Sequence, residues 1–480
     1  MKSEWMITLL TAGGILILCT AMIIWDKIRQ RKWFLRHLKQ RWGTIPDREY
    51  TQEELESISH YTRRHEGEPF MIDDITWNDL QMDEIFIRMN NTLSSCGEDV
   101  LYQMLRQPQM HREVLEERER LIAYFQTHEE ERIQVLTRVK EVKKIWKMSI
   151  ADYIDALKDV DRTGRAKYPM LAGLSVAAII ATLIKPIPCM FLLLLMLCVS
   201  AVVHTRDSKK IEPYLNCFVC ILRLLRAADQ FEKLDNPVIQ TYLDRIREGR
   251  KKMKSFRRGA FLVASTNSVQ DGLEAIVVSY LRIIFQVDFI KFYSMLKHVE
   301  GNEAIIEDMY QAIGELDALI AVASFRESLP YYSLPEFTET DNAEGASLEV
   351  EELYHPLIAD PVVNGIQMQR GVLITGSNAS GKSTFLKTIA INTILAQTVH
   401  TCIAKQHRGS FLKVLTSMAM RDNLAGGESY YMVEIRSLKR ILEECEKPEP
   451  VLCIVDEVLR GTNTIERIAA SSQILHSLAK

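Results

Sequence analysis

The residues with the strongest chemical signal form a glycine-rich segment, Gly371–Thr384, which reads GVLITGSNASGKST. A short apolar run leads into the spacing G-x-x-x-x-G-K-[ST], and a helical stretch follows it. Glycines allow successive backbone N–H groups to surround phosphates, and the positive end of the following helix faces the same charge. The segment therefore predicts a site for the phosphates of ATP, formed by Gly376, Ser377, Asn378, Ala379, Ser380, Gly381, Lys382, Ser383 and Thr384.

Two adjacent acids, Asp456 and Glu457, follow the unbroken apolar run Val451–Val455. Such a run is typical of a parallel strand that is buried on both faces, and ligands bind beyond the C-terminal ends of these strands. Asp456 and the hydroxyl of Ser383 are therefore predicted to hold Mg²⁺. Glu457 is predicted to be the catalytic base that orients and deprotonates the attacking water. Taken singly, the two motifs are also compatible with a glycine-rich turn and with ordinary surface charge.

An α/β layer is expected to position these motifs. From Ala346 onward, short β-like runs alternate with helical stretches, a pattern that indicates a mostly parallel sheet. Ser328–Gly345 contains two prolines and an acidic run, which is the composition of a linker. The expected strands are Leu348–Leu353, Gly365–Met368, Gly371–Thr375, Phe411–Thr416 and Val451–Val455.

Long helices are expected before this linker. Apolar residues recur at helical spacing from Trp77 to Thr127, and Pro108 separates two helices within that stretch. Further helices are expected at Glu129–Asp161, Ile211–Leu234, Asn236–Lys254, Thr266–His298 and Asn302–Arg326.

Three apolar segments predict a membrane protein. Met6–Trp25 is uncharged, is long enough to span a bilayer and precedes a basic cluster that should remain in the cytoplasm. Pro169–Ile184 and Ile187–Val203 are separated by Lys185-Pro186 alone, and basic residues flank both outer ends, which predicts a hairpin with both ends in the cytoplasm. A buried helical pair is the alternative. The expected topology has about three spans, the N-terminus outside, and everything from Ser208 onward in the cytoplasm.

The formal charge of -4 over 480 residues restricts any nucleic-acid contact to local patches. The densest basic patch is Arg245–Arg258, with eight Lys or Arg residues and one Glu. It could bind anionic lipid or nucleic acid, and a solvated helix face is the simpler interpretation. The nine cysteines are scattered and predict no disulfide framework, and Cys217 and Cys220 are expected at buried helix positions.

Between the two nucleotide motifs, Asp422–Glu434 reads DNLAGGESYYMVE, and Asp456–Thr462 reads DEVLRGT. These segments resemble the MutS family, whose ATPase has a D-L-A-G-G-x-S-[TY]-[FY]-M-V-E segment between its phosphate loop and a D-E-x-x-R-G-T strand end. The resemblance implies ATP and Mg²⁺ as cofactors and a base-binding segment at His355-Pro356 and Asn364. It also implies a homodimer with two composite sites, in which a trans signature faces the nucleotide of the partner subunit; the signature residues are Gly426, Gly427, Ser429 and Glu434.

The helical part is similar to the core and lever helices of the same family. The matching positions are Asn91-Thr92, Gly97, Leu101, Leu105, Pro108, Arg118, Leu316-Asp317-Ala318-Leu319 and Ala323. The sequence departs from the family at Ala379 and Ser380, where Met and Gly are usual, and at Ser417–Arg421. It shows no mismatch-reading domain with a Phe-x-Glu wedge. The sequence stops at Lys480, before the family's Thr-His switch strand, so we expect a truncated ATPase domain with impaired hydrolysis.

The expected fold class is α plus α/β: a long-helix lever and core domain with transmembrane helices, followed by a P-loop ATPase domain of the ABC type. The expected boundaries are 1–30 for the anchor, 31–75 for a basic juxtamembrane linker, 76–330 for the helical domain with its transmembrane hairpin at 169–204, 331–349 for a linker and 350–480 for the ATPase domain. The expected function is a membrane-associated MutS-like ATPase that binds DNA and couples its nucleotide state to a helical clamp. The alternatives are an ABC-type transport ATPase and a nucleotide-binding membrane scaffold.

Overall fold

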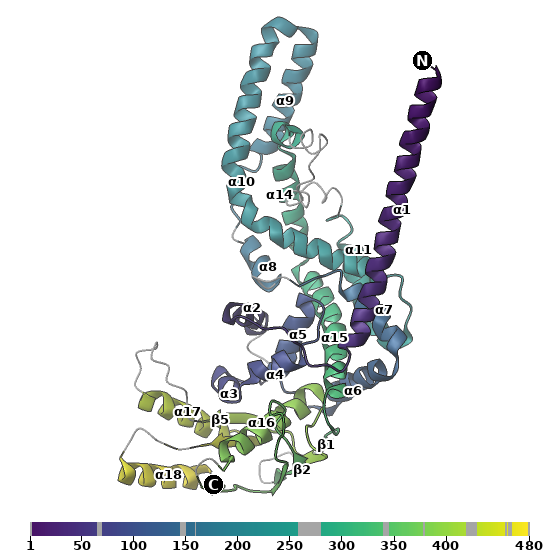
Figure 1. Cartoon of the computed structure of the whole chain (residues 1–480). Coiled ribbons are helices and arrows are strands. Elements are labelled where there is room, and N and C mark those ends of the chain that lie inside the picture. The colour runs from purple at the N-terminus through teal and green to yellow at the C-terminus, as the bar shows by residue number, and fades with distance from the viewer. Residues whose placement is uncertain are drawn as a thin grey trace.

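The protein is mostly helical with a small amount of sheet, and it is elongated (Figure 1). A computed structural model describes residues 2–64, 70–144, 150–158, 160–257, 280–338, 345–377, 380–418, 430–456, 458 and 463–478. The strands lie at one end of a helical body and a helical hairpin extends from the opposite end, while the N-terminal helix runs alongside the body in the same direction as the hairpin (Figure 1). The regions that sequence alone assigns to a membrane and to a nucleotide therefore lie at opposite ends of the molecule.

Three helices of the body begin at recognisable side-chain caps. Thr51 forms a capping box with Glu54, and the side chains of Asp73 and Ser94 accept hydrogen bonds from the first turns of the helices that follow them. The helices before the hairpin are α1 (Lys2–Arg41), α2 (Gln52–Arg63), α3 (Asp74–Asp79), α4 (Met82–Met89), α5 (Ser95–Arg106), α6 (Arg112–Thr127), α7 (Glu129–Val139) and α8 (Ile150–Lys158).

The helices expected after residue 160 are present with different ends. The second leg of the hairpin and the expected helix Ile211–Leu234 form one continuous helix of 46 residues, α10 (Pro186–Phe231). The expected helix Thr266–His298 is interrupted at Gln286, which has a left-handed backbone (φ 51°), and its residues before Tyr280 lie outside the described chain. The remaining helices of the body are α9 (Lys167–Ile184), the 3₁₀ turn η1 (Pro237–Ile239), α11 (Gln240–Lys252), α14 (Val287–Val299) and α15 (Glu303–Glu327).

The centre of the helical body is a close crossing of α5 and α15. Gly97 and Gly314 allow this approach: a Cβ at Gly97 would lie 2.2 Å from Oδ2 of Asp317, and one at Gly314 would lie 2.5 Å from the carbonyl oxygen of Cys96. Asp317 in turn accepts hydrogen bonds from the backbone N–H groups of Leu93 and Ser94. The two glycines at this crossing therefore serve packing rather than backbone flexibility.

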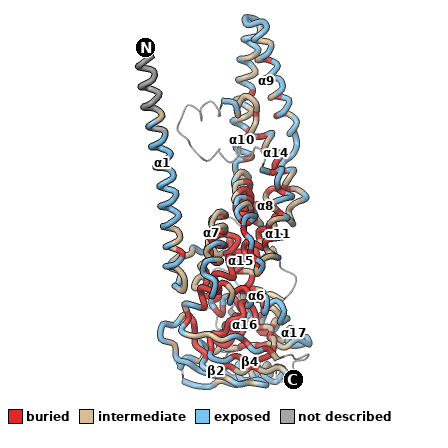
Figure 2. The backbone as a smooth tube through the Cα atoms, turned by 90° about the vertical axis from the view of Figure 1, so that its right-hand side faces the viewer, coloured by how far each residue is buried: buried red, intermediate tan, exposed pale blue. Residues whose placement is uncertain are grey.

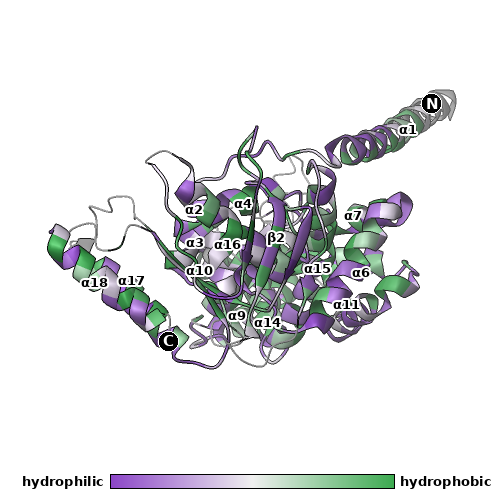
Figure 3. Ribbon diagram, turned by 90° about the horizontal axis from the view of Figure 1, so that it is seen from below, coloured by the Kyte–Doolittle hydropathy of each residue, from purple (hydrophilic) through white to green (hydrophobic). Residues whose placement is uncertain are grey.

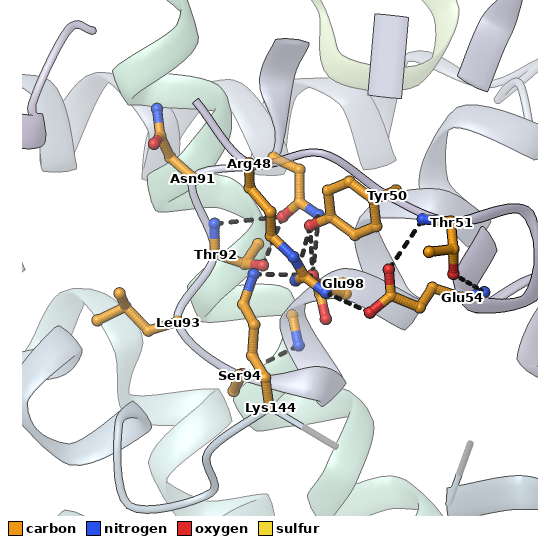
Figure 4. A network of polar contacts seen from close by, with 12 residues as sticks. Arg48, Tyr50, Thr51, Glu54, Asn91, Thr92, Leu93, Ser94, Glu98 and Lys144 are labelled. Atoms are coloured by element: carbon orange, nitrogen blue, oxygen red, sulfur yellow. Dashed lines mark hydrogen bonds and ion pairs between the residues drawn. The ribbon is translucent and has the colours of Figure 1, made fainter. Parts of the chain in front are cut away.

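A buried polar network fastens the chain after α1 to this body (Figure 4). The carboxylate of Glu98 accepts hydrogen bonds from Arg48 (2.6 Å), from the hydroxyl of Tyr50 (2.6 Å) and from Lys144 (2.7 Å). Nδ2 of Asn90 is 3.2 Å from the same oxygen. Several donors around one buried carboxylate satisfy its charge, so the segment that follows α1 is held in a fixed position.

The strands form two separate groups. β1 (Glu336–Phe337), β2 (Leu348–Leu353), β3 (Asn364–Met368) and β4 (Gln406–Gly409) form a sheet in the order β1-β4-β2-β3, and β5 (Lys413–Ser417) pairs in parallel with β6 (Val451–Val455). The expectation of a mostly parallel sheet is wrong for the larger group, because β2 is antiparallel to both β3 and β4. The connection from β2 to β3 is short and contains no helix, which suits an antiparallel pair.

The expected strand Gly371–Thr375 is also wrong. These residues belong to no strand, and the side chains of Val372 and Leu373 are 52% and 77% exposed. A β-prone apolar run forms a strand only when it pairs with another strand, and none of the described strands pairs with these residues. The helices of this part are α16 (Lys382–Val399), α17 (Tyr430–Cys445) and α18 (Thr464–Leu478).

The hairpin of α9 and α10 is the main exposed apolar surface. Figure 2 shows the buried residues gathered in the helical body and the strand-bearing part, whereas α1 and the upper hairpin are exposed. Within the described residues, two helical segments have the length and composition to cross a membrane, Lys167–Ile184 and Pro186–Glu212. Only 22% and 6% of their most apolar 18-residue stretches are buried inside the molecule. The alternative of a buried helical pair therefore does not fit the hairpin. Cys217 and Cys220, at the other end of α10, are buried as expected.

Candidate nucleotide-binding site

Helix α16 carries the glycine-rich segment at its N-terminal end. Gly381 precedes the helix with φ +86°, a backbone conformation that residues with side chains rarely adopt, and it turns the loop into the first helical residue, Lys382. The first turns of α16 are open to solvent, whereas Thr388–Val399 are buried. The helix therefore presents its free N–H groups and the positive end of its dipole at the molecular surface.

Three predicted residues converge at this end of α16. The ammonium group of Lys382 donates hydrogen bonds to the carbonyl oxygens of Gly376 (2.7 Å) and Ser377 (2.6 Å), so its side chain folds back over the loop. The hydroxyl of Ser383 donates to Oδ2 of Asp456 at 2.5 Å. A cation, a hydroxyl and a carboxylate thus face one open loop at a helix N-terminus.

The pairing of β5 with β6 brings Asp456 to this place. The register runs in parallel from Lys413 opposite Val451 to Ser417 opposite Val455, and the backbone N–H of Asp456 continues the ladder to the carbonyl oxygen of Ser417. Because the strand ends there, the Asp456 side chain is free to reach the first turn of α16. The sequence prediction that an acid follows a strand beside the phosphate loop agrees with this geometry.

The other predicted residues fall into two groups. Ser380 and Thr384 are exposed on either side of Gly381 and Lys382, and Glu434 is partly buried in the second turn of α17. His355 is buried near α16, where burial and the positive charge of Lys387 lower its pKa, and Asn364 is exposed at the start of β3. The residues that lie outside the described chain are Asn378, Ala379, Gly426, Gly427, Ser429 and the predicted catalytic base Glu457.

The donor set at this end suits a hard cation bound with a phosphate. Mg²⁺ prefers oxygen ligands, keeps several waters and is usually held by one or two protein oxygens together with substrate phosphates. The Ser383 hydroxyl and the Asp456 carboxylate supply two such oxygens, 2.5 Å apart and both at the surface. Among the residues that the structure describes, no group of three or more His, Cys, Asp or Glu side chains forms a metal site.

The opposite end of α16 is held by a set of charged groups that the sequence did not reveal. Arg326 of α15 donates to both carboxylate oxygens of Glu119 on α6, and also to the carbonyl oxygen of His400 at 2.9 Å. The imidazole of His400 lies 3.2 Å from the same carboxylate, and Arg118 donates to the carbonyl oxygen of Thr398. We call Arg118, Glu119, Arg326 and His400 the α16 anchor. It joins the end of α16 to two long helices of the body, α6 and α15.

A second joint links the body to the end of β5. The carboxylate of Asp79 in α3 accepts hydrogen bonds from the Thr416 hydroxyl (2.7 Å) and from the backbone N–H of Met418 (3.0 Å). Arg440 of α17 pairs with Asp73 at the start of α3 and donates to the carbonyl oxygen of Thr416. Sequence reasoning missed this joint because a polar residue in a short helix carries no local signal of a distant partner.

The basic patch Arg245–Arg258 is largely neutralised within the molecule. Arg250 and Arg257 pair with Asp229, and Arg245 pairs with Asp308 and Glu315. Further ion pairs within the patch join Arg247 to Asp244 and Lys252 to Glu248, and Arg258 lies outside the described chain. These contacts favour the interpretation as a solvated helix face over a site for anionic lipid or nucleic acid.

Comparisons with known proteins agree with the site's location. Residues 372–480 match the family model of MutS domain V. The DNA mismatch repair protein msh3 of Aspergillus fumigatus is 30% identical over 199 residues, which are 39% of this chain and 17% of that relative. The DNA mismatch repair protein MutS 1 of Halobacterium salinarum is 30% identical over 196 residues, 39% of this chain and 22% of that relative.

These matches support membership of the MutS family for the part of the chain that they cover. The match to domain V begins at Val372 and contains the loop, Lys382, Ser383 and Asp456. The chain covers about a fifth of the length of these relatives. Activities and partners of the whole relatives do not transfer to this chain by similarity alone.

Proposed function

We propose that this MutS-family chain is a membrane-anchored nucleotide-binding protein that holds ATP and Mg²⁺ at the N-terminal end of α16. The observation that carries the proposal is the convergence of Lys382, Ser383 and Asp456 on one open loop. Lys382 would bind the outer phosphates, the Gly376–Thr384 loop would surround them with N–H groups, and Ser383 and Asp456 would hold the metal. Bound Mg²⁺ would neutralise phosphate charge while Glu457 positions water for hydrolysis.

The proposal extends to the rest of the molecule through two joints. The α16 anchor fixes the phosphate-loop helix to α6 and α15, and Asp79 fixes the end of β5 to α3. A movement of α16 on nucleotide binding would therefore be passed to the helical body, and from there to α10 and the hairpin. We propose that this coupling drives a helical clamp that binds DNA, and that two chains form a dimer with Gly426, Gly427, Ser429 and Glu434 facing the partner's nucleotide.

The membrane part of the proposal rests on three helices, α1, α9 and α10, that all lie on the side of the molecule away from the strands (Figure 1). The exposed hairpin and α1 both extend in the direction that leads away from the strands (Figure 1). Seven basic residues between Lys27 and Arg41 follow the apolar stretch of α1, which favours a cytoplasmic body by the positive-inside rule. The hairpin apex at Lys185 would then lie outside.

Calorimetric titration of the full chain with ATP and Mg²⁺ tests the nucleotide site. Lys382→Ala is expected to weaken ATP binding at least about tenfold, equivalent to about 1.4 kcal/mol, because the outer phosphates lose a direct cation. Lys405→Ala is the matched control, since Lys405 is an exposed lysine of the same part that pairs with Glu352. Unchanged ATP affinity in Lys382→Ala, or equal losses in both variants, would refute the proposed site.

Two further measurements separate the DNA and membrane components. DNA affinity is expected to differ between the ATP-bound and ADP-bound protein and to fall steeply with salt. A folded chain that fails to bind DNA at low salt would contradict the DNA-binding part of the proposal.

In intact cells, an impermeant thiol reagent is expected to label Lys185→Cys but not Lys405→Cys. Labelling of Lys405→Cys from outside would show that the strand-bearing part lies outside the cell and would contradict the proposed topology.

A further inference from the structure

The two legs of the hairpin are joined at their base by a buried acid. Asp207 of α10 is 2% exposed, and its carboxylate accepts hydrogen bonds from the ammonium group of Lys167 (2.5 Å) and from the hydroxyl of Tyr168 (3.1 Å). Lys167 and Tyr168 are the first two residues of α9. The ammonium group of Lys210, one turn after Asp207, lies 3.4 Å from the other carboxylate oxygen. The start of α9 is therefore held beside this turn of α10.

Aromatic side chains of α14 support the same base. The ring of Tyr168 stacks on that of Phe289, with 4.5 Å between the ring centroids, and on that of Tyr293 at 5.8 Å. The hydroxyl of Tyr293 also donates a hydrogen bond to the carbonyl oxygen of Asp161, shortly before α9 (3.1 Å). These contacts fix the position of the chain where it enters the hairpin.

Both legs change from apolar to basic at this base. On α9, Met170 is 62% exposed, and the exposed Arg165 lies just before the helix begins. On α10, Val202 is 67% exposed, and the exposed Arg206 follows about one helical turn later. Since the buried carboxylate joins the legs at these positions, the exposed apolar surface ends at the same level on both.

Three cations at this level have no ion-pair partner in the part of the chain that the structure describes. They are Arg165, Arg206 and Lys209, all exposed, and we call them the collar. Asp161, in the turn before α9, instead accepts hydrogen bonds from the N–H (2.8 Å) and the hydroxyl (2.6 Å) of Thr163. α9 begins without a side-chain cap, so the positive end of its dipole adds to the charge of the collar.

We propose that the collar is a binding site for the phosphate headgroups of anionic phospholipids in the leaflet next to the helical body. The inference rests on the proposed membrane anchoring and names the lipid class that the hairpin base would bind. A guanidinium group can donate two parallel hydrogen bonds to one phosphate, and each cation near an anionic bilayer surface strengthens binding about fivefold. Lipid binding is thereby assigned to the collar and not to Arg245–Arg258, where Arg245, Arg250 and Arg257 are paired within the molecule.

A phospholipid fits this surface better than a nucleic acid does. Its tails would cover exposed apolar side chains such as Met170 and Val202, while its phosphate would meet Arg165 and Arg206 at the edge of the apolar surface. A nucleic acid would satisfy the cations and would leave the apolar side chains of both legs in water, at a free-energy cost that grows with their area.

Native mass spectrometry tests the collar on the full chain, reconstituted into vesicles of equal amounts of phosphatidylglycerol and phosphatidylcholine and then extracted in mild detergent. The unsubstituted protein is expected to retain phosphatidylglycerol in preference to phosphatidylcholine. Arg165→Gln combined with Arg206→Gln removes one cation from each leg and is expected to lower the ratio of the two retained lipids about fivefold for each cation. Arg165→Lys combined with Arg206→Lys keeps the charge and is expected to keep most of the preference.

The matched control is Lys251→Gln combined with Lys254→Gln, which removes the same charge from two exposed lysines of Arg245–Arg258 and is expected to leave the ratio unchanged. No preference in the unsubstituted protein, or equal losses in the collar and control variants, would overturn the proposal. A collar variant that keeps its preference for phosphatidylglycerol but loses affinity for DNA would also overturn it, because the collar would then bind nucleic acid.

Alkaline extraction separates this inference from membrane anchoring. The chain is expected to stay in vesicles of phosphatidylcholine alone at alkaline pH, with or without the collar substitutions, because apolar helices and not the collar hold it there. Release of the unsubstituted chain would refute the membrane anchoring on which the inference rests. Retention of the chain without a preference for phosphatidylglycerol would refute the collar site alone.

Discussion

The two ends of helix α16 differ in almost every physical respect. Its N-terminal end is exposed, follows a loop that belongs to no strand, and presents Lys382 and Ser383 to solvent. Its C-terminal end is buried, and guanidinium groups from α6 and α15 cap its last carbonyl oxygens. The helix is therefore fixed where it meets the body and open where a ligand would bind. The comparison indicates that stability and ligand binding are assigned to opposite ends of one helix.

The largest expected effect comes from breaking the anchored end. Arg326→Ala would leave the carboxylate of Glu119 without its bidentate partner in a site where the Arg326 side chain is 1% exposed. Removal of one member of a buried ion pair is expected to lower the free energy of unfolding by about 3–5 kcal/mol. Urea denaturation would measure this loss of stability. Arg120→Ala, the control, removes an exposed ion pair with Glu117 on α6 and should lower the free energy of unfolding by less than about 1 kcal/mol. Equal losses in the two variants would contradict the distinction between the anchored and the open end of α16.

The pH dependence of stability should report on the same anchor. Burial opposes ionisation of Glu119, but hydrogen bonds from His400 and Arg326 outweigh it and lower the pKa from 4.5 to about 2. A depressed folded-state pKa stabilises the protein above the unfolded pKa, so this contribution should be lost as pH falls from 4.5 towards 2. Glu119→Gln should flatten the acid limb of the stability profile. An unchanged acid limb would show that the carboxylate is not held as the structure indicates.

At the open end, the backbone rather than a side-chain contact should matter most. Gly381 has φ +86°, and a left-handed conformation costs other residues about 1–2 kcal/mol. Gly381→Ala should therefore lower stability by roughly that amount and also weaken ATP binding, because the loop must reorganise to avoid the strain. Gly371→Ala is the control, since a Cβ there meets nothing within 4 Å. Similar behaviour of the two variants would indicate a loop without a fixed conformation.

The smallest effect on stability is expected at the ligand position itself. Ser383→Ala removes an exposed hydrogen bond to Asp456 and should change the free energy of unfolding by no more than about 0.5 kcal/mol. ATP binding should nevertheless lose most of its dependence on Mg²⁺ in this variant. Calorimetry with and without the metal would measure that loss. A large destabilisation with normal Mg²⁺ dependence would reverse the roles assigned to the two ends of α16.

The open end of α16 could be predicted from sequence because its chemistry is local. The spacing from Gly376 to Ser383 and the acid after Val455 are sufficient to place a phosphate loop beside a strand end. The anchored end could not be predicted, because Glu119, Arg326 and His400 are more than 70 residues apart from one another and each is an ordinary polar residue in its own segment. The partner of a single charged residue, when it lies far away along the chain, leaves no periodic pattern in the sequence.

The failure at Gly371–Thr375 has a different physical cause. An apolar β-prone run predicts a strand only if a neighbouring strand offers unpaired backbone groups, and periodicity carries no information about the neighbour. The same limit explains why the expectation of a mostly parallel sheet is wrong around β2, which is antiparallel to β3 and β4. The exposed apolar hairpin of α9 and α10 was easier to predict, since it depends on length and composition rather than on pairing.

Helix α10 connects the hairpin to the body without a loop (Figure 1). Because its backbone hydrogen bonds run on from Pro186 to Phe231, the upper part cannot rotate about its axis unless Phe218 and Ile221, which are packed in the core, turn with it. In a bilayer, a change in lipid thickness that favours a different tilt of the hairpin would therefore strain that packing. α17 and α18 lie along one edge, away from the main group of helices, when the molecule is seen from below (Figure 3).

If the hairpin spans a bilayer as proposed, the thickness of the lipid would influence the packing of the helical body, in addition to holding the protein at the membrane.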